Sequence, residues 1–236
     1  MLLDLLAPRT DSATANMATD FLLLQHYSAP THARFRAYGW SRPAVTFGFG
    51  QKIAWVRDHL PADFAGELCR RPTGGGLVDH RNDYTYALVI PRESPVADLR
   101  AVESYRLVHE ALAAALRALG HDAIVKLACE QLSPANTGPT LCFTRAELYD
   151  VVNPTTGKKL AGAAQKRSKR GLLFQGSLAR PALAHDLDDE SFHAAFTSQV
   201  ATTLNLVTTP APWPDLDESI TALAEQYTTT QWIDYR

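Results

Sequence analysis

The stretch Arg-Arg-Pro-Thr-Gly-Gly-Gly-Leu-Val-Asp-His at residues 70–80 says more about this chain than any other. Three successive glycines let backbone N–H groups approach an anion or a carbonyl oxygen, because no Cβ atom stands in the way. A basic pair precedes these glycines and a histidine follows them. The stretch has neither the spacing of a P-loop nor the spaced glycines of a dinucleotide fingerprint. Neither template therefore predicts nucleotide binding.

A second stretch, Gly-Lys-Lys-Leu-Ala-Gly-Ala-Ala-Gln-Lys-Arg at residues 157–167, places a lysine among small residues. In this order, the two stretches resemble the lipoate and octanoate protein-transferase family, which has biotin protein ligases as distant relatives. Shorter matches are Asn-Met-Ala-Thr-Asp at 16–20, Tyr-Gly-Trp at 38–40 and Leu-Phe-Gln-Gly-Ser-Leu at 173–178. The resemblance implies an α+β catalytic domain of the biotin/lipoate protein ligase type, similar to class II aminoacyl-tRNA synthetases, with mixed, mainly antiparallel sheets flanked by helices.

Composition is that of an ordinary soluble globular protein: 236 residues, 46% hydrophobic, 20% charged, and a formal net charge of -2. We expect one catalytic domain over residues 1–236, with residues 185–236 as a C-terminal helical extension. No apolar run approaches membrane-spanning length. The apolar opening at residues 1–6 contains Asp4 and has no basic n-region, so it does not indicate export. We expect a cytoplasmic protein with no membrane or nucleic-acid partner.

Hydrophobic spacing and turn residues predict the secondary structure. Asp98 is expected to cap the start of the second helix, and Gly120 to end it. A loop is expected at 132–140, where proline, asparagine and glycine gather. The predicted helices are 16–27, 98–119, 189–206 and 217–227, and the predicted strands are 34–38, 44–49, 84–90, 123–127, 148–152, 159–164 and 172–178.

The three cysteines, Cys69, Cys129 and Cys142, have no Cys-x-x-Cys spacing, and the eight histidines show no metal-ligand pattern. We therefore predict no disulfide framework and no metal site, in a reducing compartment. Free cysteines usually act as small buried hydrophobes, which is the expectation for Cys69 and Cys129. Cys142 differs because Leu-Cys-Phe at 141–143 resembles the cysteine-bearing stretch of the Gram-positive-type octanoyltransferases.

The resemblance and the chemistry together suggest the site residues. Transfer from a thioester needs a thiolate nucleophile, a neighbouring cation and donors for an oxyanion. Cys142 and Lys159 are the predicted catalytic residues, with Lys159 polarising the acyl carbonyl and lowering the pKa of the thiol. His80 is read equally well as a general base or as a hydrogen-bonded core histidine. The predicted substrate-binding residues are Arg71, Gly74, Gly75, Gly76, His80, Gly162 and Ala163.

The resemblance implies transfer of an octanoyl or lipoyl group from an acyl-carrier-protein thioester to the target lysine of a lipoyl domain, without a cofactor. Acceptors would be lipoyl domains of 2-oxoacid dehydrogenases or the glycine cleavage H protein. The alternatives are a lipoate-protein ligase using ATP and Mg, an amidotransferase between lipoyl proteins, and a non-catalytic binding subunit. One departure from the family pattern weakens the ligase interpretation. In many ligases an aspartate directly follows the histidine, whereas here Arg-Asn-Asp follows His80. Biotin ligation is not predicted, because the biotin-binding loop is missing.

Six basic residues fall within residues 158–170 with no acidic residue among them. Charge on a solvated edge strand would account for such a run. The hypothesis favoured here is that the run docks an acidic acyl-carrier protein or lipoyl domain. The six residues are Lys158, Lys159, Lys166, Arg167, Lys169 and Arg170.

Overall fold

The computed structural model describes residues 1–128 and 146–235 of the chain. An eight-stranded sheet has the order β11-β1-β2-β6-β10-β9-β8-β7, and a three-stranded sheet has the order β4-β3-β5. In the large sheet, β1 is parallel to β2 and β11, and the other pairs are antiparallel. The strands are β1 (Leu2–Asp11), β2 (Ala33–Trp40), β3 (Ala44–Phe47), β4 (Glu67–Arg70), β5 (Leu77–Asp79), β6 (Asp83–Pro91), β7 (Ile124–Val125), β8 (Val151–Val152), β9 (Lys159–Ser168), β10 (Gly171–Ala179) and β11 (Val207–Ala211).

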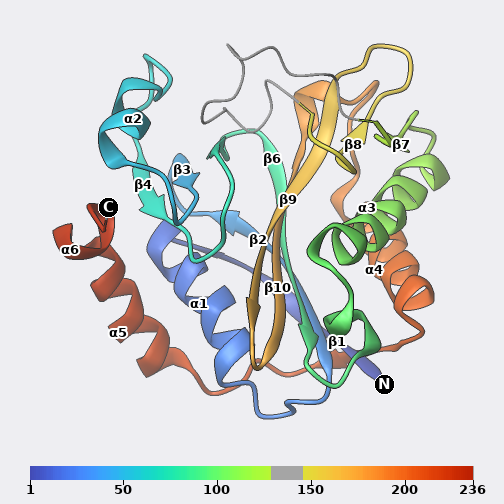
Figure 1. The fold of residues 1–236 in the computed structure, drawn as a ribbon, viewed down its shortest axis with the longest axis horizontal. Helices are drawn as coiled ribbons and strands as arrows, with labels where there is room; N and C mark the ends of the chain where they lie inside the picture. The colour runs from blue at the N-terminus through green and yellow to red at the C-terminus, as the bar shows by residue number, and fades with distance from the viewer. Residues whose placement is uncertain (129–145, 236) are drawn as a thin grey trace.

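Helices cover both faces of the large sheet, which confirms the predicted α+β class (Figure 1). Helices α3 and α4 pack on one face, where Phe35, Phe174 and Phe196 are fully buried. Helices α1 and α5 lie over the other face. The helices are α1 (Ala13–Gln25), α2 (Ile53–Asp58), α3 (Ala101–Ala118), α4 (Asp189–Leu204), α5 (Asp217–Thr228) and α6 (Thr230–Ile233), with 3-10 turns η1 (Pro95–Asp98) and η3 (Arg180–Ala182). No helix within the described ranges is long and apolar enough to cross a bilayer.

The β9–β10 hairpin carries the second motif into the centre of the molecule. Its pairing is continuous from Ser168↔Gly171 to Ala161↔Leu178. Side chains alternate between the two faces of the strand, so Leu172 and Phe174 join the α3 and α4 core while Leu173 joins the core under α1. Gln175 points to the α1 side as well, where its amide meets Asp20.

Helix α3 begins differently from the prediction. Asp98 does not cap it: Asp98 ends the 3-10 turn η1 and forms an ion pair with Arg92 at 2.6 Å. Arg100 is the N-cap residue, and the Glu103 side chain accepts from its backbone N–H at 3.0 Å. The predicted end is confirmed, because Gly120 follows the helix with a φ of +84°.

The first and last parts of the chain differ most from expectation. Residues 2–11 form a strand that the sequence reading did not predict, and residues 207–211 pair with it in parallel. The segment 185–236 is therefore not a purely helical extension, since it adds a strand to the large sheet. Helix α4 also contributes Phe192 and Phe196 to the main core, both fully buried.

The C-terminal helices are fastened to the small sheet by Arg70. Its buried guanidinium donates to the carbonyl oxygens of Phe49, Gln51, Trp232 and Ile233 at 2.6–3.0 Å. Trp232 Nε1 donates back to the Arg70 carbonyl oxygen at 3.0 Å. Five hydrogen bonds thus join the end of β4 to α6 and to the loop after β3. The first arginine of the basic pair has a structural role.

Candidate active site

Arg71, the second arginine, holds the glycine stretch in shape. Its guanidinium donates to the carbonyl oxygens of Gly74 at 2.7 and 3.1 Å and of Gly76 at 2.9 Å. It also donates to Thr46 Oγ1 on β3 at 3.1 Å. Gly75 has a φ of +90°, and a Cβ atom there would lie 2.8 Å from Arg71 Nη2. Glycine at 75 is required both by its backbone angle and by the arginine packed beneath it.

The carbonyl oxygens of the glycine stretch are turned toward the protein. Besides those bonded to Arg71, the Gly75 carbonyl accepts from Gln51 Nε2 at 2.9 Å, and Gly76 also accepts from the Gly48 N–H at 3.2 Å. Within the described residues, no acceptor is recorded for the N–H groups of Gly74, Gly75 or Gly76. A peptide stretch with its oxygens fixed on one side presents donors on the other, which suits an oxyanion.

Lys159 at the start of β9 is buried in an ion pair. Its Nζ lies 2.7 Å from Asp150 Oδ2, and the two side chains are 8% and 1% exposed. The same Oδ2 accepts from the Glu147 N–H at 2.6 Å. Asp150 Oδ1 accepts from the Tyr105 hydroxyl at 2.6 Å, and this hydroxyl accepts from the Ala163 N–H at 3.0 Å. Asp150 thus supplies the countercharge that a buried ammonium group needs.

Gly162 makes room for this pair. A Cβ atom at 162 would lie 2.6 Å from Lys159 Cε, 2.7 Å from its Nζ and 3.0 Å from Asp150 Oδ1. The lysine side chain therefore lies back over the backbone of its own strand, where only glycine permits it. This close approach explains why residue 162 of the second motif is a glycine.

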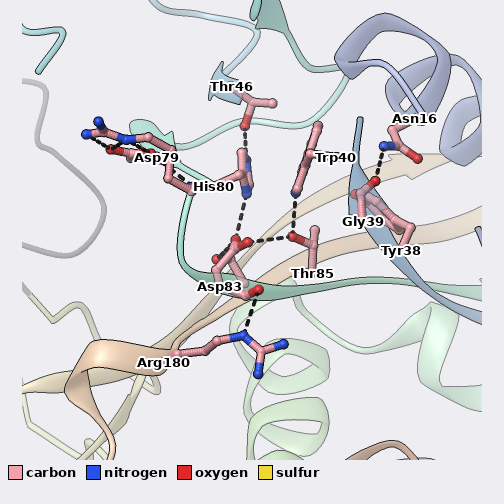
Figure 2. A network of polar contacts seen from close by, with 12 residues as sticks. Asn16, Tyr38, Gly39, Trp40, Thr46, Asp79, His80, Asp83, Thr85 and Arg180 are labelled. Atoms are coloured by element: carbon pink, nitrogen blue, oxygen red, sulfur yellow. Dashed lines mark hydrogen bonds and ion pairs between the residues drawn. The ribbon is translucent and has the colours of Figure 1, made fainter. Parts of the chain in front are cut away.

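His80 is fixed on both ring nitrogens (Figure 2). Nε2 lies 2.8 Å from Thr46 Oγ1, and Nδ1 lies 2.7 Å from Asp83 Oδ2. The Trp40 ring stacks on the imidazole with centroids 4.2 Å apart, while its Nε1 donates to Thr85 Oγ1 at 3.0 Å. Since a carboxylate only accepts, Nδ1 carries a proton. The missing acidic neighbour of His80 is thus supplied three residues later by Asp83, and the ring matches a hydrogen-bonded core histidine more closely than a free base.

A narrow cavity of about 60 Å³ lies between the two sheets and gathers most of the predicted site. Lys159 lines it from β9 and His80 from the residue just after β5, with apolar contacts from Met17 and Val78. Gly74 and Gly76 flank it without lining it. The predicted residues on its wall are Arg71, Gly75, His80, Lys159, Gly162 and Ala163.

A buried polar network links the glycine stretch to the large sheet, and two of its members, Tyr38 and Gln175, line the cavity. Thr73 Oγ1, from the glycine stretch, donates to Gln175 Oε1 on β10 at 2.7 Å. Gln175 Nε2 donates to Asp20 Oδ2 at 2.7 Å, and the Tyr38 hydroxyl donates to the same oxygen at 3.0 Å. Arg36 pairs with Asp20 at 2.7 Å, and both side chains are fully buried. None of these residues was among the predicted site residues, although Asp20 lies in the 16–20 motif and Gln175 in the 173–178 motif.

The basic residues of the 158–170 run do not all lie on one side of the folded protein. Lys159 lies in the site, whereas Lys166 lies over the Phe49 and Phe21 rings at 5.7 and 5.9 Å. Arg167 faces the opposite side, donating to the Ala97 carbonyl at 2.7 Å and to Ser104 Oγ at 3.2 Å. Adjacent residues of a strand point to opposite faces. The run is therefore not one continuous docking surface.

The cysteines are only partly accounted for. Burial raises the pKa of Cys69 to about 12, so this thiol is unreactive, in agreement with its predicted structural role. Cys142 and Cys129 lie outside the described residues, and the role of Cys142 stays a prediction. In the described parts of the chain, no three His, Cys, Asp or Glu side chains gather as a metal-binding group.

Asp150 and Tyr105 are the site residues that sequence reasoning missed. Strands were predicted at residues 148–152 and 159–164, and the observed register pairs Val151 with Ala161 and Val152 with Lys159. Because Val151 pairs with Ala161, the preceding residue, Asp150, lies across from Gly162. Knowing the register would therefore have been enough to predict the position of Asp150. Tyr105 gave no such signal, because its spacing on α3 is that of an ordinary core position.

The comparisons with known proteins agree with this geometry. The family model of the lipoyl protein ligase A/B catalytic domain matches residues 12–210. Octanoyltransferase LipM from Kyrpidia tusciae is 34% identical over 187 residues, which cover 78% of this chain and 66% of that protein. The protein of the same name from Bacillus subtilis is 32% identical over 192 residues, with 78% and 66% covered. The chain thus spans about two thirds of the length of these curated relatives.

Solved structures share the fold. Lipoate-protein ligase A bound with ATP superposes with a TM-score of 0.75 at 20% identity, covering 99% of this chain and 98% of the other. The archaeal bipartite lipoate protein ligase from Thermoplasma acidophilum gives a TM-score of 0.72 at 20% identity, covering 98% and 96%. At such identities the likeness concerns the fold. With the family model matching most of its length, this chain belongs to the lipoyl protein ligase A/B catalytic domain family.

Proposed function

We propose that this protein transfers an octanoyl group from an acyl-carrier-protein thioester to the target lysine of a lipoyl domain. The observation that carries the proposal is the buried Lys159 cation on the wall of a cavity that also includes Gly75 of the glycine stretch. The similarity to proteins named octanoyltransferase supports this choice of acyl group and acceptor.

The first half of the reaction forms an acyl-enzyme. The Cys142 thiolate attacks the thioester carbonyl carbon, and the carbonyl oxygen becomes an oxyanion. Lys159 and the N–H groups of Gly74–Gly76 stabilise this oxyanion. An ammonium group has three N–H donors, so Lys159 can donate to a carbonyl oxygen while it is paired with Asp150. Collapse of the intermediate releases the carrier thiolate and leaves octanoyl on Cys142.

The second half transfers the chain to the acceptor. The neutral amine of the acceptor lysine attacks the new thioester, and the same donors stabilise the second oxyanion. Collapse forms the amide and expels the Cys142 thiolate, and the proton lost by the amine neutralises a thiolate. The small residues at 162–164 and the apolar Met17 and Val78 form a wall suited to an aliphatic chain.

An ATP-dependent ligase would instead need cations along a phosphate chain. A groove of about 730 Å³ adjoins Lys159 and is lined by Lys158 and Arg81. Arg81 is bonded to the carboxylates of Asp79 and Asp63 at 2.7–2.8 Å. Within the described residues, that leaves Lys158 as the groove's cation without a recorded carboxylate partner. These cations are few for binding a triphosphate. The ligase that uses ATP and Mg is therefore kept as an alternative that the test below can reveal.

The test is the intact mass of an apo lipoyl domain after incubation with this protein and octanoyl-acyl-carrier protein, without ATP. We expect the mass to increase by one octanoyl group. Parallel incubations supply octanoate with ATP and Mg, or an octanoylated H protein as donor. A product only with ATP would replace the transferase by a ligase, and a product only from the octanoylated H protein would replace it by an amidotransferase. Binding without any product would leave a non-catalytic subunit.

A further inference from the structure

Tyr105 connects three parts of the Lys159 site. Its ring comes from α3, whereas Lys159 and Asp150 belong to β9 and to the turn before β8. One hydroxyl donates to Asp150 Oδ1 at 2.6 Å and accepts from the Ala163 N–H at 3.0 Å. Burial first, and the Asp150 charge second, raise the pKa of Tyr105 well above its ordinary value. The hydroxyl therefore keeps the proton that it donates to the carboxylate.

The Tyr105 hydroxyl also completes the edge of β9. Strand β8 is only two residues long, and its pairing with β9 reaches no further than Ala161. The Ala163 N–H lies beyond that pairing, and an unpaired N–H in a half-buried place is unfavourable. Tyr105 supplies the missing acceptor. The bond fixes the carboxylate against the strand that carries Lys159.

Helix α3 also holds the backbone next to Asp150. Tyr149 has a φ of 66°, an unfavourable conformation for a bulky residue. His109 Nδ1 lies 2.6 Å from the Tyr149 carbonyl oxygen, so His109 donates to it. Tyr105 and His109 are one helical turn apart, with ring centroids 4.0 Å apart. One side chain holds the carboxylate, and the other holds the strained peptide before it.

We propose that Tyr105 is a positioning residue for Lys159, acting through Asp150 to hold the ammonium group at the cavity wall. Without the hydroxyl, one oxygen of Asp150 loses its donor, and the carboxylate can rotate and take the lysine with it. The catalytic meaning of this arrangement rests on the proposed function. The positioning itself is a property of the ion pair and can be measured without turnover.

The first experiment measures the accessibility of the Lys159 amine by trace acetylation with acetic anhydride and peptide mass spectrometry. The exposed neighbour Lys158 is the internal reference. In the wild type we expect Lys159 to acetylate far more slowly than Lys158, and Tyr105→Phe to raise the Lys159 to Lys158 ratio severalfold. Tyr86→Phe is the matched control, because the buried Tyr86 hydroxyl has no hydrogen-bond partner among the described residues. An unchanged ratio in Tyr105→Phe, or an equal rise in both variants, overturns the inference.

The second experiment asks whether Tyr105 acts through Lys159. Octanoyl transfer is measured for the wild type, Tyr105→Phe, Lys159→Met and the double variant. A lost hydrogen bond to a charged group corresponds to a fall in kcat of roughly tenfold or more. We expect this fall with little change in KM, and less than a twofold further effect of Tyr105→Phe once Lys159 is gone. Full additivity contradicts the inference. If the wild type makes no product, the proposed function fails, and acetylation alone decides the role of Tyr105.

Discussion

Two basic side chains line the same cavity, and the partners recorded for them among the described residues differ in kind. Arg71, the first residue after β4, donates within the described ranges to the carbonyl oxygens of Gly74 and Gly76 and to the hydroxyl of Thr46. Lys159, from the large sheet, pairs with the Asp150 carboxylate at 2.7 Å. A guanidinium fork suits fixed backbone oxygens, whereas an ammonium group is a compact charge that can be shared with a second oxygen. We infer that Arg71 fixes the conformation of the glycine stretch, whereas Lys159 supplies the positive charge at the cavity wall.

Arg70, next to Arg71 in the sequence, has a different role. Arg70 and Arg71 look equivalent in the sequence, yet Arg70 donates to four carbonyl oxygens on the far side of the small sheet. Arg70 is the last residue of β4 and bonds to the C-terminal helices, whereas Arg71 is the first residue after the strand and bonds to the glycine stretch. A basic pair beside glycines is therefore not in itself a binding site for an anion.

The largest effect is expected for Lys159→Met. Loss of an oxyanion donor lowers the transfer rate by about 10²–10³-fold. The variant also loses stability, by about 3 kcal/mol or more, because Asp150 stays buried without its countercharge. Adding Asp150→Asn should restore much of the stability and none of the rate, as measured by thermal melts and initial rates. Recovery of the rate would show that the charge of Lys159 is dispensable.

The support from α3 predicts a pH dependence of stability. Burial lowers the pKa of His109 from 6.5 to about 4, so the folded protein keeps this ring neutral where the unfolded chain binds a proton. Stability should fall as the pH drops from about 6.5 to about 4, by about 3 kcal/mol from this group, and no further below that. Urea unfolding across this range checks it. In His109→Gln the decrease should be smaller, and an identical pH profile would refute the assignment.

For Arg71→Met we expect a loss of stability of about 2 kcal/mol, because several buried acceptors lose their donor. The rate should fall only about tenfold, through disorder of the glycine stretch rather than loss of charge. Arg71→Lys should behave much like Arg71→Met, since an ammonium group cannot bond both glycine carbonyls and Thr46 at once. Full activity in Arg71→Lys would mean that Arg71 acts as a charge, and the comparison with Lys159 would fail.

The smallest effect concerns docking of the protein substrate. Lys166→Glu should raise KM for the carrier or lipoyl domain a few-fold at low salt, with less effect at high salt. Arg167→Glu should mainly reduce stability, because Arg167 is bonded to Ala97 and Ser104. Kinetics at two ionic strengths, with melting temperatures, separate the two variants. Equal salt-sensitive KM changes in both would restore a single docking surface.

Much of the fold could be predicted because its elements have local signals. Helix α3 follows its apolar spacing to Gly120, and the β9–β10 hairpin follows its alternating residues. Strands β1 and β11 have no such signal, because each is defined by its partner. Residues 1–6 read only as an apolar opening, and residues 207–211 are largely exposed. Parallel pairing between segments at the two ends of a chain depends on the tertiary structure and leaves no local pattern in the sequence.

The site could be predicted as far as the motifs reach. Both stretches meet at one cavity, and Asp83 supplies the acid that seemed displaced. The partners that set the chemistry come from elsewhere. Asp150 is nine residues before Lys159 on the other arm of a hairpin, and Tyr105 is on a helix more than fifty residues away. Their roles depend on packing and register, which local patterns do not contain.

The most direct test of the division between shape and charge is single-turnover octanoyl transfer by Lys159→Met/Asp150→Asn and by Arg71→Lys, each followed alongside its melting temperature. The account predicts that the first variant is folded and slower by about 10²–10³-fold, while the second melts earlier and is slower by about tenfold. A folded Lys159→Met/Asp150→Asn variant that transfers octanoyl at the wild-type rate would contradict it.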